Sequence, residues 1–114
     1  MHEFRIIEFV DSSGKSPFHD WISLLDVTTR ARIHARLFRI ESGNLGDVKP
    51  LASGLYEARL NFGPGYRIYF GIADHLLIVL LAGGDKKNQD RDIRSAKINW
   101  ILWKRGQSRA KKKS

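Results

Sequence analysis

Four cationic side chains make the middle of the chain a place where phosphate chemistry could occur. Arg59 and Arg67 lie in two alternating segments, and Lys86 and Lys87 follow a long apolar run. A planar guanidinium can hold two phosphate oxygens at once, whereas a lysine supplies a mobile point charge. We therefore predict that Arg67, with Arg59 beside it, stabilises charge on a phosphate that Lys86 and Lys87 also contact.

Other side chains in the same region could move protons. A lysine held among other cations loses its proton more easily than an isolated one, which makes Lys86 the preferred acid or base. Asp90 and Glu57 are candidate bases, and Tyr69 could donate a proton or stack on a nucleobase. Each also has a structural explanation, because Glu57 could pair with Arg59, Asp90 could cap a helix and Tyr69 could pack in a sheet.

The segments that carry the two arginines predict a β-hairpin. In residues 55–62 and 66–72, apolar and polar side chains alternate, which is the period of a strand with one buried face. Residues 63–65 read Gly-Pro-Gly and form the expected turn. The two arginines should therefore share the polar face of one hairpin.

The apolar face sets the register expected for this hairpin. A shift of one residue would turn every side chain to the wrong face, so the pairing must keep the apolar residues together. Phe62 opposite Tyr66 satisfies this condition. The pairs then expected on the polar face are Arg59 with Tyr69 and Asn61 with Arg67.

A third strand and a final helix follow the hairpin. Residues 76–81 are apolar at every position, as is typical of a strand covered on both faces, and we expect this strand at the centre of the sheet. Asn88 is placed as the N-cap of a helix over residues 89–105 that ends at Gly106. Lys86 and Lys87 would then lie where the central strand ends.

The final helix carries two apolar stripes. The first is predicted to be buried and consists of Ile93, Ala96, Trp100 and Trp103. The second lies on another side of the helix and consists of Ile98, Ile101 and Leu102. Either the helix is wedged between two apolar surfaces or the second stripe is kept for a partner.

The first half of the chain predicts a strand over residues 4–10 and two helices. Ser16 and Pro17 begin a short helix that ends near residue 26, and Thr28 caps a second helix that ends at residue 42. Residues 44–53 are expected to form a loop.

The second helix buries a stripe of Ile33, Leu37 and Ile40. The rest of its surface is largely basic, which indicates a solvated face or a surface that follows an acidic partner or an RNA backbone: Arg30, Arg32, His34, Arg36 and Arg39.

The expected order is strand, helix, helix, strand, strand, strand, helix. A small, mostly antiparallel sheet with two N-terminal helices and one C-terminal helix makes an α+β domain.

Composition limits the possible sites and compartments. The chain has 114 residues and no cysteine, which supports one core and excludes disulfides, thiolate catalysis and cysteine zinc sites. The four histidines lack ligand spacing, so we expect neither a metal site nor a cofactor. The longest apolar run, residues 76–82, falls well short of the ~20 residues that cross a membrane. The start of the chain does not resemble a signal peptide, so the expected compartment is the cytoplasm.

The positive charge is unevenly distributed. Of the formal net charge of +8, half comes from residues 107–114, which carry four basic side chains and no acid. We therefore expect one domain over residues 1–106 and a basic, disordered tail over residues 107–114. A plain nucleic-acid-binding module that relies on this tail and the basic helix is one hypothesis, and deletion of the tail should then eliminate its function.

Three segments carry a resemblance to a known family. They are residues 54–60, 63–70 and 83–93, which read GLYEARL, GPGYRIYF and GGDKKNQDRDI. Together they resemble the RelE/ParE superfamily of toxins from bacterial toxin–antitoxin modules, and most closely its HigB-like addiction module killer branch. The resemblance spans nearly all of residues 1–104.

The resemblance implies a RelE-like, microbial-RNase-like α+β fold and metal-independent, ribosome-dependent cleavage of mRNA that inhibits translation. It also implies a helix-turn-helix (HigA-like) antitoxin from the same operon, with which the toxin could form a heterotetramer. The ParE branch instead inhibits DNA gyrase, and fold likeness alone does not decide between the two activities. A gyrase-inhibiting toxin and an inactive, toxin-like binding protein are therefore the alternatives.

Metal-free RNA cleavage needs a base for the ribose 2′-hydroxyl, cations on the scissile phosphate and an acid for the leaving 5′-oxygen. Arg67 matches the arginine that the ribonuclease branch carries on its middle strand. The expected catalytic residues are Arg67, Lys86, Arg59 and Asp90. The expected substrate contacts are Lys87, Tyr69, Lys49 and Asn61. Some members of the branch use a histidine or a C-terminal tyrosine as proton donor, and this chain has neither between Asp85 and the end of its last helix.

Overall fold

The computed structural model describes residues 3–74 and 76–113. One sheet and three helices account for most of these residues, joined by short turns. In chain order the elements are β1 (Arg5–Glu8), α1 (Pro17–Ser23), α2 (Val27–Glu41), β2 (Val48–Ala52), β3 (Leu55–Leu60), β4 (Tyr66–Ala73), β5 (Leu77–Asp85), the 3₁₀ turn η1 (Lys86–Asn88) and α3 (Gln89–Lys113).

Five strands form a mixed sheet in the order β1-β5-β4-β3-β2. β1 runs parallel to β5, and the other neighbouring strands are antiparallel, so the predicted α+β class and mostly antiparallel sheet are confirmed. The prediction that residues 76–81 form the central strand is wrong, because β4 occupies the middle of the sheet. β5 is still an interior strand, since β1 covers its outer edge, and its apolar side chains are buried on both faces.

β2 is a strand that the sequence analysis did not predict. It pairs antiparallel with β3 in the segment expected to be a loop, so the sheet has one strand more than the predicted order. Pro50 lies within β2 and has no N–H group to donate to a neighbour. Such a residue is tolerated in edge strands, at strand starts and at bulges, and a short edge strand with proline leaves little signal in a sequence.

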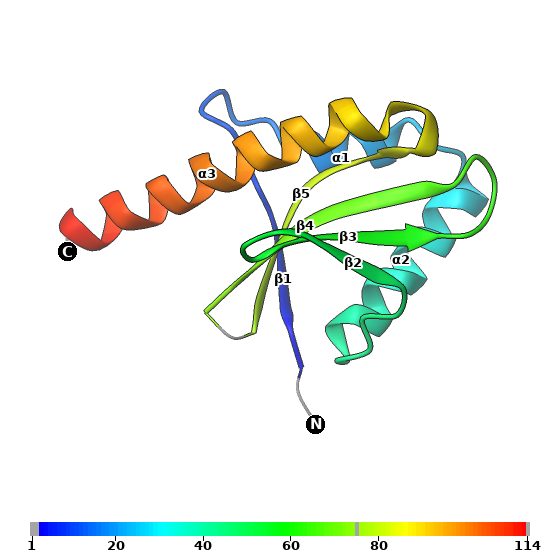
Figure 1. Ribbon diagram of the computed structural model, residues 1–114, viewed down its shortest axis with the longest axis horizontal. Helices are drawn as coiled ribbons and strands as arrows, with labels where there is room; N and C mark the ends of the chain where they lie inside the picture. The colour runs from blue at the N-terminus through cyan, green and yellow to red at the C-terminus, as the bar shows by residue number, and fades with distance from the viewer. Residues whose placement is uncertain (1–2, 75, 114) are drawn as a thin grey trace.

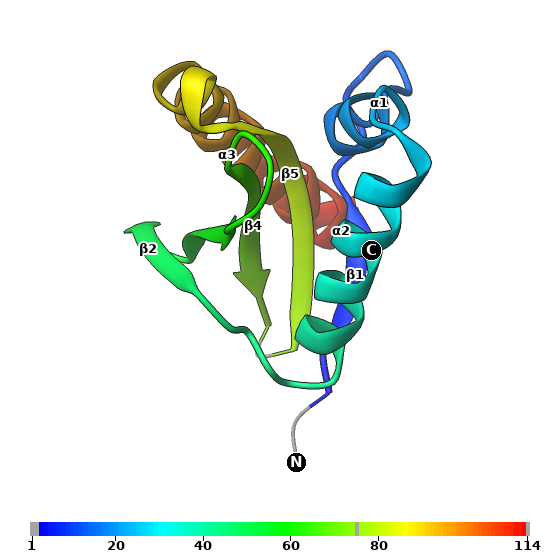
Figure 2. The same cartoon turned by 90° about the vertical axis from the view of Figure 1, so that its right-hand side faces the viewer.

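The sheet lies between two helical layers (Figures 1 and 2). α1 and α2 cover one face, where Phe18, Ile33 and Ile68 belong to one buried apolar cluster. α3 crosses the other face, where Tyr69 and Trp100 belong to a second cluster. The face of the hairpin that the sequence marks as polar is therefore covered by a helix.

The hairpin has the predicted faces but not the predicted register. Leu60 is opposite Tyr66, Arg59 is opposite Arg67, and Glu57 is opposite Tyr69, so the expected pairing was two residues off. A shift of two residues keeps every side chain on its own face, and the apolar pattern therefore could not detect it. The turn decides the register: its five residues, 61–65, include glycines with positive φ at positions 63 and 65.

The helix boundaries follow their capping residues. α1 begins as predicted, with the Ser16 side chain accepting a hydrogen bond from the His19 backbone N–H. It ends at Ser23 rather than near residue 26, because Asp26 already caps α2 by accepting from the Thr29 backbone N–H. The predicted cap at Thr28 is therefore wrong, and aspartate is as good an N-cap as threonine.

α3 is longer than the sequence predicts. It does not end at Gly106 but continues to Lys113, because a glycine in an exposed helix costs only about 1 kcal/mol and need not end it. Ile98, Ile101 and Leu102 are 58%, 46% and 45% exposed, so α3 is not wedged between two apolar surfaces.

Candidate functional site

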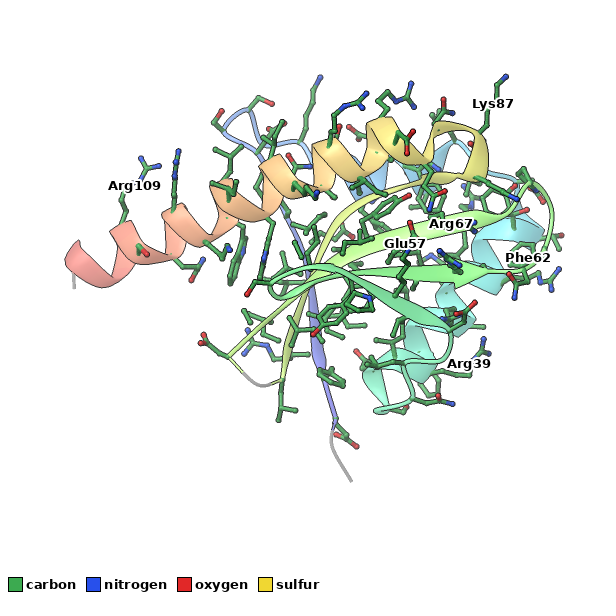
Figure 3. All side chains as sticks on the ribbon, in the orientation of Figure 1. Arg39, Glu57, Phe62, Arg67, Lys87 and Arg109 are labelled. Atoms are coloured by element: carbon green, nitrogen blue, oxygen red, sulfur yellow. The ribbon has the colours of Figure 1, made fainter. Side chains whose placement is uncertain are left out.

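A buried carboxylate, that of Glu57, connects the polar residues between the sheet and α3. Its side chain is 0% exposed, and its carboxylate accepts 2.8 Å hydrogen bonds from Nε of Arg59 and Nε2 of Gln89. Nε of Arg67 lies 3.8 Å from the oxygen that Arg59 contacts. Figure 3 shows Glu57 and Arg67 below the first turns of α3. We call Glu57, Arg59, Arg67 and Gln89 the Glu57 centre.

The pairing of β3 with β4 explains why these groups meet. Arg59 and Arg67 are directly opposed, and Glu57 is two residues before Arg59 on the same face of β3. Two opposed guanidinium groups repel each other, so a carboxylate beside both is needed to stabilise the pair. The sequence predicted that the two arginines share a face, but it did not place Glu57 between them.

The charges of the Glu57 centre depend on one another. Burial raises the pKa of the Glu57 carboxyl, but hydrogen bonds from Arg59 and Gln89 and the charge of Arg67 outweigh burial and bring the pKa below its ordinary value. The same pairing raises the pKa of Arg59. At neutral pH the centre therefore holds one carboxylate and two guanidinium groups.

Tyr69 is buried next to Glu57. Its side chain is 0% exposed, and burial followed by the nearby charge of Glu57 raises the pKa of its hydroxyl. A buried ring cannot stack on a nucleobase, so the prediction that Tyr69 contacts substrate is wrong. Its position between the sheet and α3 makes it a core residue.

Asp92 is a second buried carboxyl that the sequence analysis did not single out. It is 8% exposed, and its Oδ2 has no hydrogen-bond partner among the described residues. Burial raises the pKa of this carboxyl, and the neighbouring charge of Arg91 only partly opposes the effect. Gly84 packs against it, because a Cβ at this position would overlap the Asp92 carboxylate.

Exposed polar side chains surround the start of α3. Lys86, Lys87 and Asp90 are all exposed. Gly65 of the hairpin turn lies between Lys86 and Arg67 of the Glu57 centre. A Cβ at this position would be 3.5 Å from Nη1 of Arg67 and 3.5 Å from Cβ of Lys86. A shallow pocket of about 360 Å³ is lined by Lys86, Lys87, Asn88, Gln89, Asp90, Arg91 and Arg94.

The cap at this end of α3 differs from the prediction. Asp85 caps the 3₁₀ turn that precedes α3, with its carboxylate accepting from the Asn88 backbone N–H at 3.2 Å. Asn88 is therefore the last residue of the turn and not the N-cap of the helix. The extra turn carries Lys86 and Lys87, so both lysines lie on a tight helical turn.

The remaining predicted site residues differ in exposure and position. The Arg67 side chain is only 9% exposed, whereas that of Arg59 is 33% exposed. Burial leaves Arg67 little surface for a phosphate, which argues against its expected part as the principal clamp, and Arg59 is the more accessible of the two guanidinium groups. Lys49 is exposed on β2 directly opposite Glu57 and thus shares its face. Asn61 follows the last residue of β3 and lines a different pocket.

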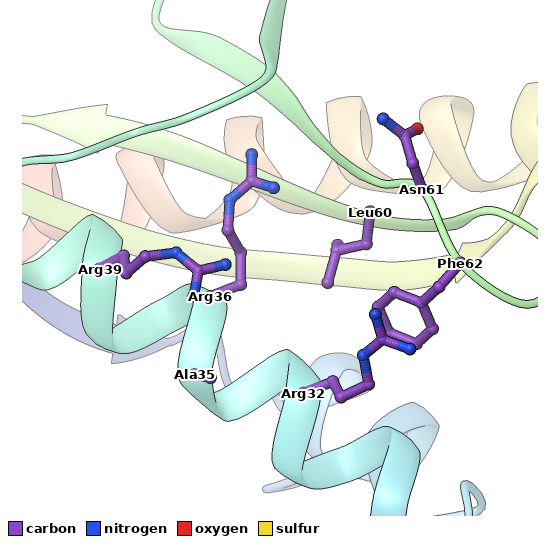
Figure 4. Close-up of a pocket in the computed structure, with 7 residues that line it drawn as sticks. All are labelled: Arg32, Ala35, Arg36, Arg39, Leu60, Asn61 and Phe62. Atoms are coloured by element: carbon purple, nitrogen blue, oxygen red, sulfur yellow. The ribbon is translucent and has the colours of Figure 1, made fainter.

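That pocket is an arginine-rich groove between α2 and the end of β3 (Figure 4). Arg36 is 8% exposed and donates hydrogen bonds to the backbone oxygens of Leu45, Asp47 and Arg59. The groove, which we call the α2 groove, has a volume of about 300 Å³ and is lined by Arg32, Ala35, Arg36, Arg39, Leu60, Asn61 and Phe62.

From the sequence, the arginines of the α2 groove are predicted only as part of a general basic surface on the second helix. The spacing of these arginines indicates that they share one face of the helix, because Arg32, Arg36 and Arg39 are four and three residues apart. The burial of Arg36 depends on the loop before β2 and on β3, which no helical periodicity reveals.

The described residues contain neither a metal-binding cluster nor a helix that could span a membrane. Within residues 3–74 and 76–113, no group of three or more His, Cys, Asp or Glu side chains is placed to hold a metal ion. Two of the four histidines, His2 and His75, lie outside those residues. No helix in the same part of the chain combines the length and apolar composition needed to cross a membrane.

Comparison with known proteins gives a relative but no activity. No family model matches the chain. An uncharacterized protein of Haemophilus influenzae is 43% identical over 82 residues, an alignment that covers 71% of this chain and 83% of that protein. Identity at this level over most of both chains establishes kinship, and the chain therefore belongs to the same family as the Haemophilus influenzae protein.

Proposed function

We propose that the chain is the toxin of a type II toxin–antitoxin module, a cytoplasmic endoribonuclease that cleaves mRNA on the ribosome without a metal ion. The Glu57 centre carries the proposal. The three segments that resemble RelE/ParE toxins are separate in sequence, yet residues 54–60 supply Glu57 and Arg59, residues 63–70 supply Arg67, and residues 83–93 supply Gln89. Their convergence on one polar centre is what a shared reaction site requires.

Each accessible residue near the centre has a chemical part in this proposal. Arg59 contacts the scissile phosphate, because it keeps a third of its side-chain surface while Glu57 holds it in place. Arg67 is a positioning residue that fixes Glu57. Asp90 accepts the proton of the ribose 2′-hydroxyl, whose oxygen then attacks the phosphorus. Lys86 donates a proton to the leaving 5′-oxygen, and Lys87 binds an adjacent phosphate.

The proposal includes a partner. A helix-turn-helix antitoxin of the HigA-like kind, encoded in the same operon, would neutralise the toxin and could form a heterotetramer with it. A small helix-turn-helix protein in the neighbouring reading frame would support this part of the proposal. Co-expression of the two proteins should then restore growth.

The activity can be tested by inducing the protein in a bacterial host and mapping new 5′ ends of transcripts. The wild type should arrest growth and create ends within codons, and Arg59→Ala should abolish both. Arg109→Ala is the matched control, because it removes the same charge at the far end of α3 (Figure 3). Circular dichroism should show that both variants are folded. Growth arrest and cleavage by a folded Arg59→Ala protein would remove the claim.

One observation favours a non-enzymatic alternative. Glu57 and Tyr69 are fully buried, and of the proton carriers that the sequence predicts only Asp90 and Lys86 are exposed in the described residues. A toxin of this fold could inhibit DNA gyrase, or it could have lost activity and only bind its partner. A DNA-damage response without new mRNA ends would support gyrase inhibition, and no growth arrest would support the binding protein.

A further inference from the structure

The α2 groove gathers positive charge that the protein itself does not pair. Its lining contains Arg32, Arg36 and Arg39 but no acidic residue. The ion pairs within the described part of the chain involve other arginines, namely Arg59, Arg67 and Arg91. Like charges held together on one surface repel each other, so a groove of this kind is suited to an anionic ligand.

Arg36 shows that the groove is a built feature and not a chance gathering of mobile side chains. Its guanidinium is held by three backbone oxygens at 2.8 to 3.0 Å, and its Nε has no hydrogen-bond partner among the described residues. Burial and the charge of Arg39 lower the pKa of Arg36, which the charge of Asp47 only partly opposes. The groove thus has a rigid, incompletely compensated cation at its base.

The other lining residues suit a nucleotide better than an acidic peptide. The guanidinium carbon of Arg32 lies 3.7 Å from the centroid of the Phe62 ring, which holds the guanidinium plane in place (Figure 4). Such a plane can stack on an unpaired base, and the amide of Asn61 can pair with a base edge. An acidic peptide would use the charges of the groove but not these two features.

The groove is next to the Glu57 centre. Nη1 of Arg36 donates to the backbone oxygen of Arg59, and the side chains of Arg59 and Leu60 point to opposite faces of β3. β2 pairs with β3 as far as Ala58, and the Asp47 backbone oxygen then accepts a 3.0 Å hydrogen bond from the Arg59 backbone N–H, so no strand covers the edge of β3 beyond Arg59. A single RNA strand can therefore pass around this edge from Arg59 to the groove.

We propose that the α2 groove binds the phosphodiester backbone of the RNA strand that is held at Arg59, with Arg32 and Arg39 as the phosphate contacts. The inference rests on the proposed function because it takes RNA as the ligand. It extends the substrate contact to the opposite face of the sheet and makes Arg32, Arg39 and Asn61 substrate-binding residues.

Binding can be measured without cleavage. The probe is a fluorescent single-stranded 2′-O-methyl RNA of about 12 nucleotides, whose blocked 2′-oxygen cannot attack the phosphate. The variant is Arg32→Gln/Arg39→Gln. Its matched control is Arg5→Gln/Arg109→Gln, which removes the same charge from exposed positions outside the groove. Arg36 is left unchanged because it holds three backbone segments together.

Loss of two phosphate contacts should weaken binding about 25-fold near 0.1 M salt and reduce the slope of log K against log salt by about 1.4. The control should lose less than about threefold. Equal losses in the variant and the control would overturn the inference, because they would show only a general effect of charge. Failure of the wild-type protein to bind the probe would also overturn it.

Two further results separate this inference from the proposed function. If Arg32→Gln/Arg39→Gln binds RNA normally while Arg59→Ala loses cleavage, the groove proposal fails and the nuclease proposal stands. If the groove variant loses RNA binding while Arg59→Ala still arrests growth, the groove proposal stands and the reaction site is wrong. If the groove variant loses affinity only for an acidic protein partner, RNA is the wrong ligand.

Discussion

The Glu57 centre and the α2 groove both hold arginines against β3, but they treat the positive charge differently. In the Glu57 centre a buried carboxylate lies beside two guanidinium groups. In the α2 groove three arginines line a pocket without an acid. Compensation by Glu57 holds the arginines of the centre in place and leaves Arg59 as its accessible cation, whereas the uncompensated charge of the open groove is available to a ligand.

In both sites the buried arginine and the exposed arginines have different roles. Each has one arginine that is more than nine-tenths buried, Arg67 in the centre and Arg36 in the groove. Each also has more exposed arginines beside it, Arg59 in the centre and Arg32 and Arg39 in the groove. The buried arginine of each site fixes backbone or carboxylate oxygens, and its exposed neighbours can contact substrate.

The largest effect is expected from Glu57→Gln. This change keeps the shape of the side chain but leaves Arg67 buried without its counter-charge, so the free energy of unfolding should fall by about 3–5 kcal/mol. Urea denaturation measures the loss. Glu3→Gln is the control, because it makes the same change at an exposed position and should alter the same quantity by less than about 0.5 kcal/mol. Similar losses in both would contradict the contrast drawn between the two sites.

The pH dependence of stability should be smaller and should have two opposite components. The pKa of Glu57 is lowered on folding, so its contribution is present above the ordinary value of 4.5 and is lost as the pH falls through the folded value. The pKa of Asp92 is raised, so stability instead falls as the pH rises from 3.8 through its folded value. Asp92→Asn should remove only the second component. Urea denaturation at a series of pH values measures both components. A change of stability in the opposite direction for either carboxyl would contradict the prediction.

The smallest effect on stability is expected in the α2 groove. Arg32→Gln/Arg39→Gln removes one exposed cation–π contact and relieves repulsion among the arginines, so the free energy of unfolding should change by about 1 kcal/mol or less. Urea denaturation tests this directly. A loss comparable to that of Glu57→Gln would show that the groove is a structural feature and not a free surface.

Features that depend on nearby residues were predictable from the sequence. The start of α1 at Pro17 follows from a serine cap and a proline at the first helical position. The buried faces of α2 and of the hairpin follow from their periods, and the α+β class follows from the order of these elements. Asp26 was missed because Thr28, two residues later, is also a good cap.

Features that depend on distant residues were not predictable in this way. The hairpin register was two residues off because both pairings bury the same apolar face, and only the five-residue turn separates them. β2 was missed because its strand character comes from its partner β3. Both exposed lysines before α3 were placed near Arg67 from the sequence, but the burial of Arg67 was not foreseen.

The amino-acid sequence by itself determined where most of the strands and helices begin, which of their faces are apolar and where cations are concentrated, because these properties repeat within a few residues. The tertiary structure decided which cations are accessible. Arg67 is buried below the first turns of α3 (Figure 3), and Arg36 is buried because a loop and β3 close around it. Exposure depends on segments far apart in the chain, so no local pattern can supply it.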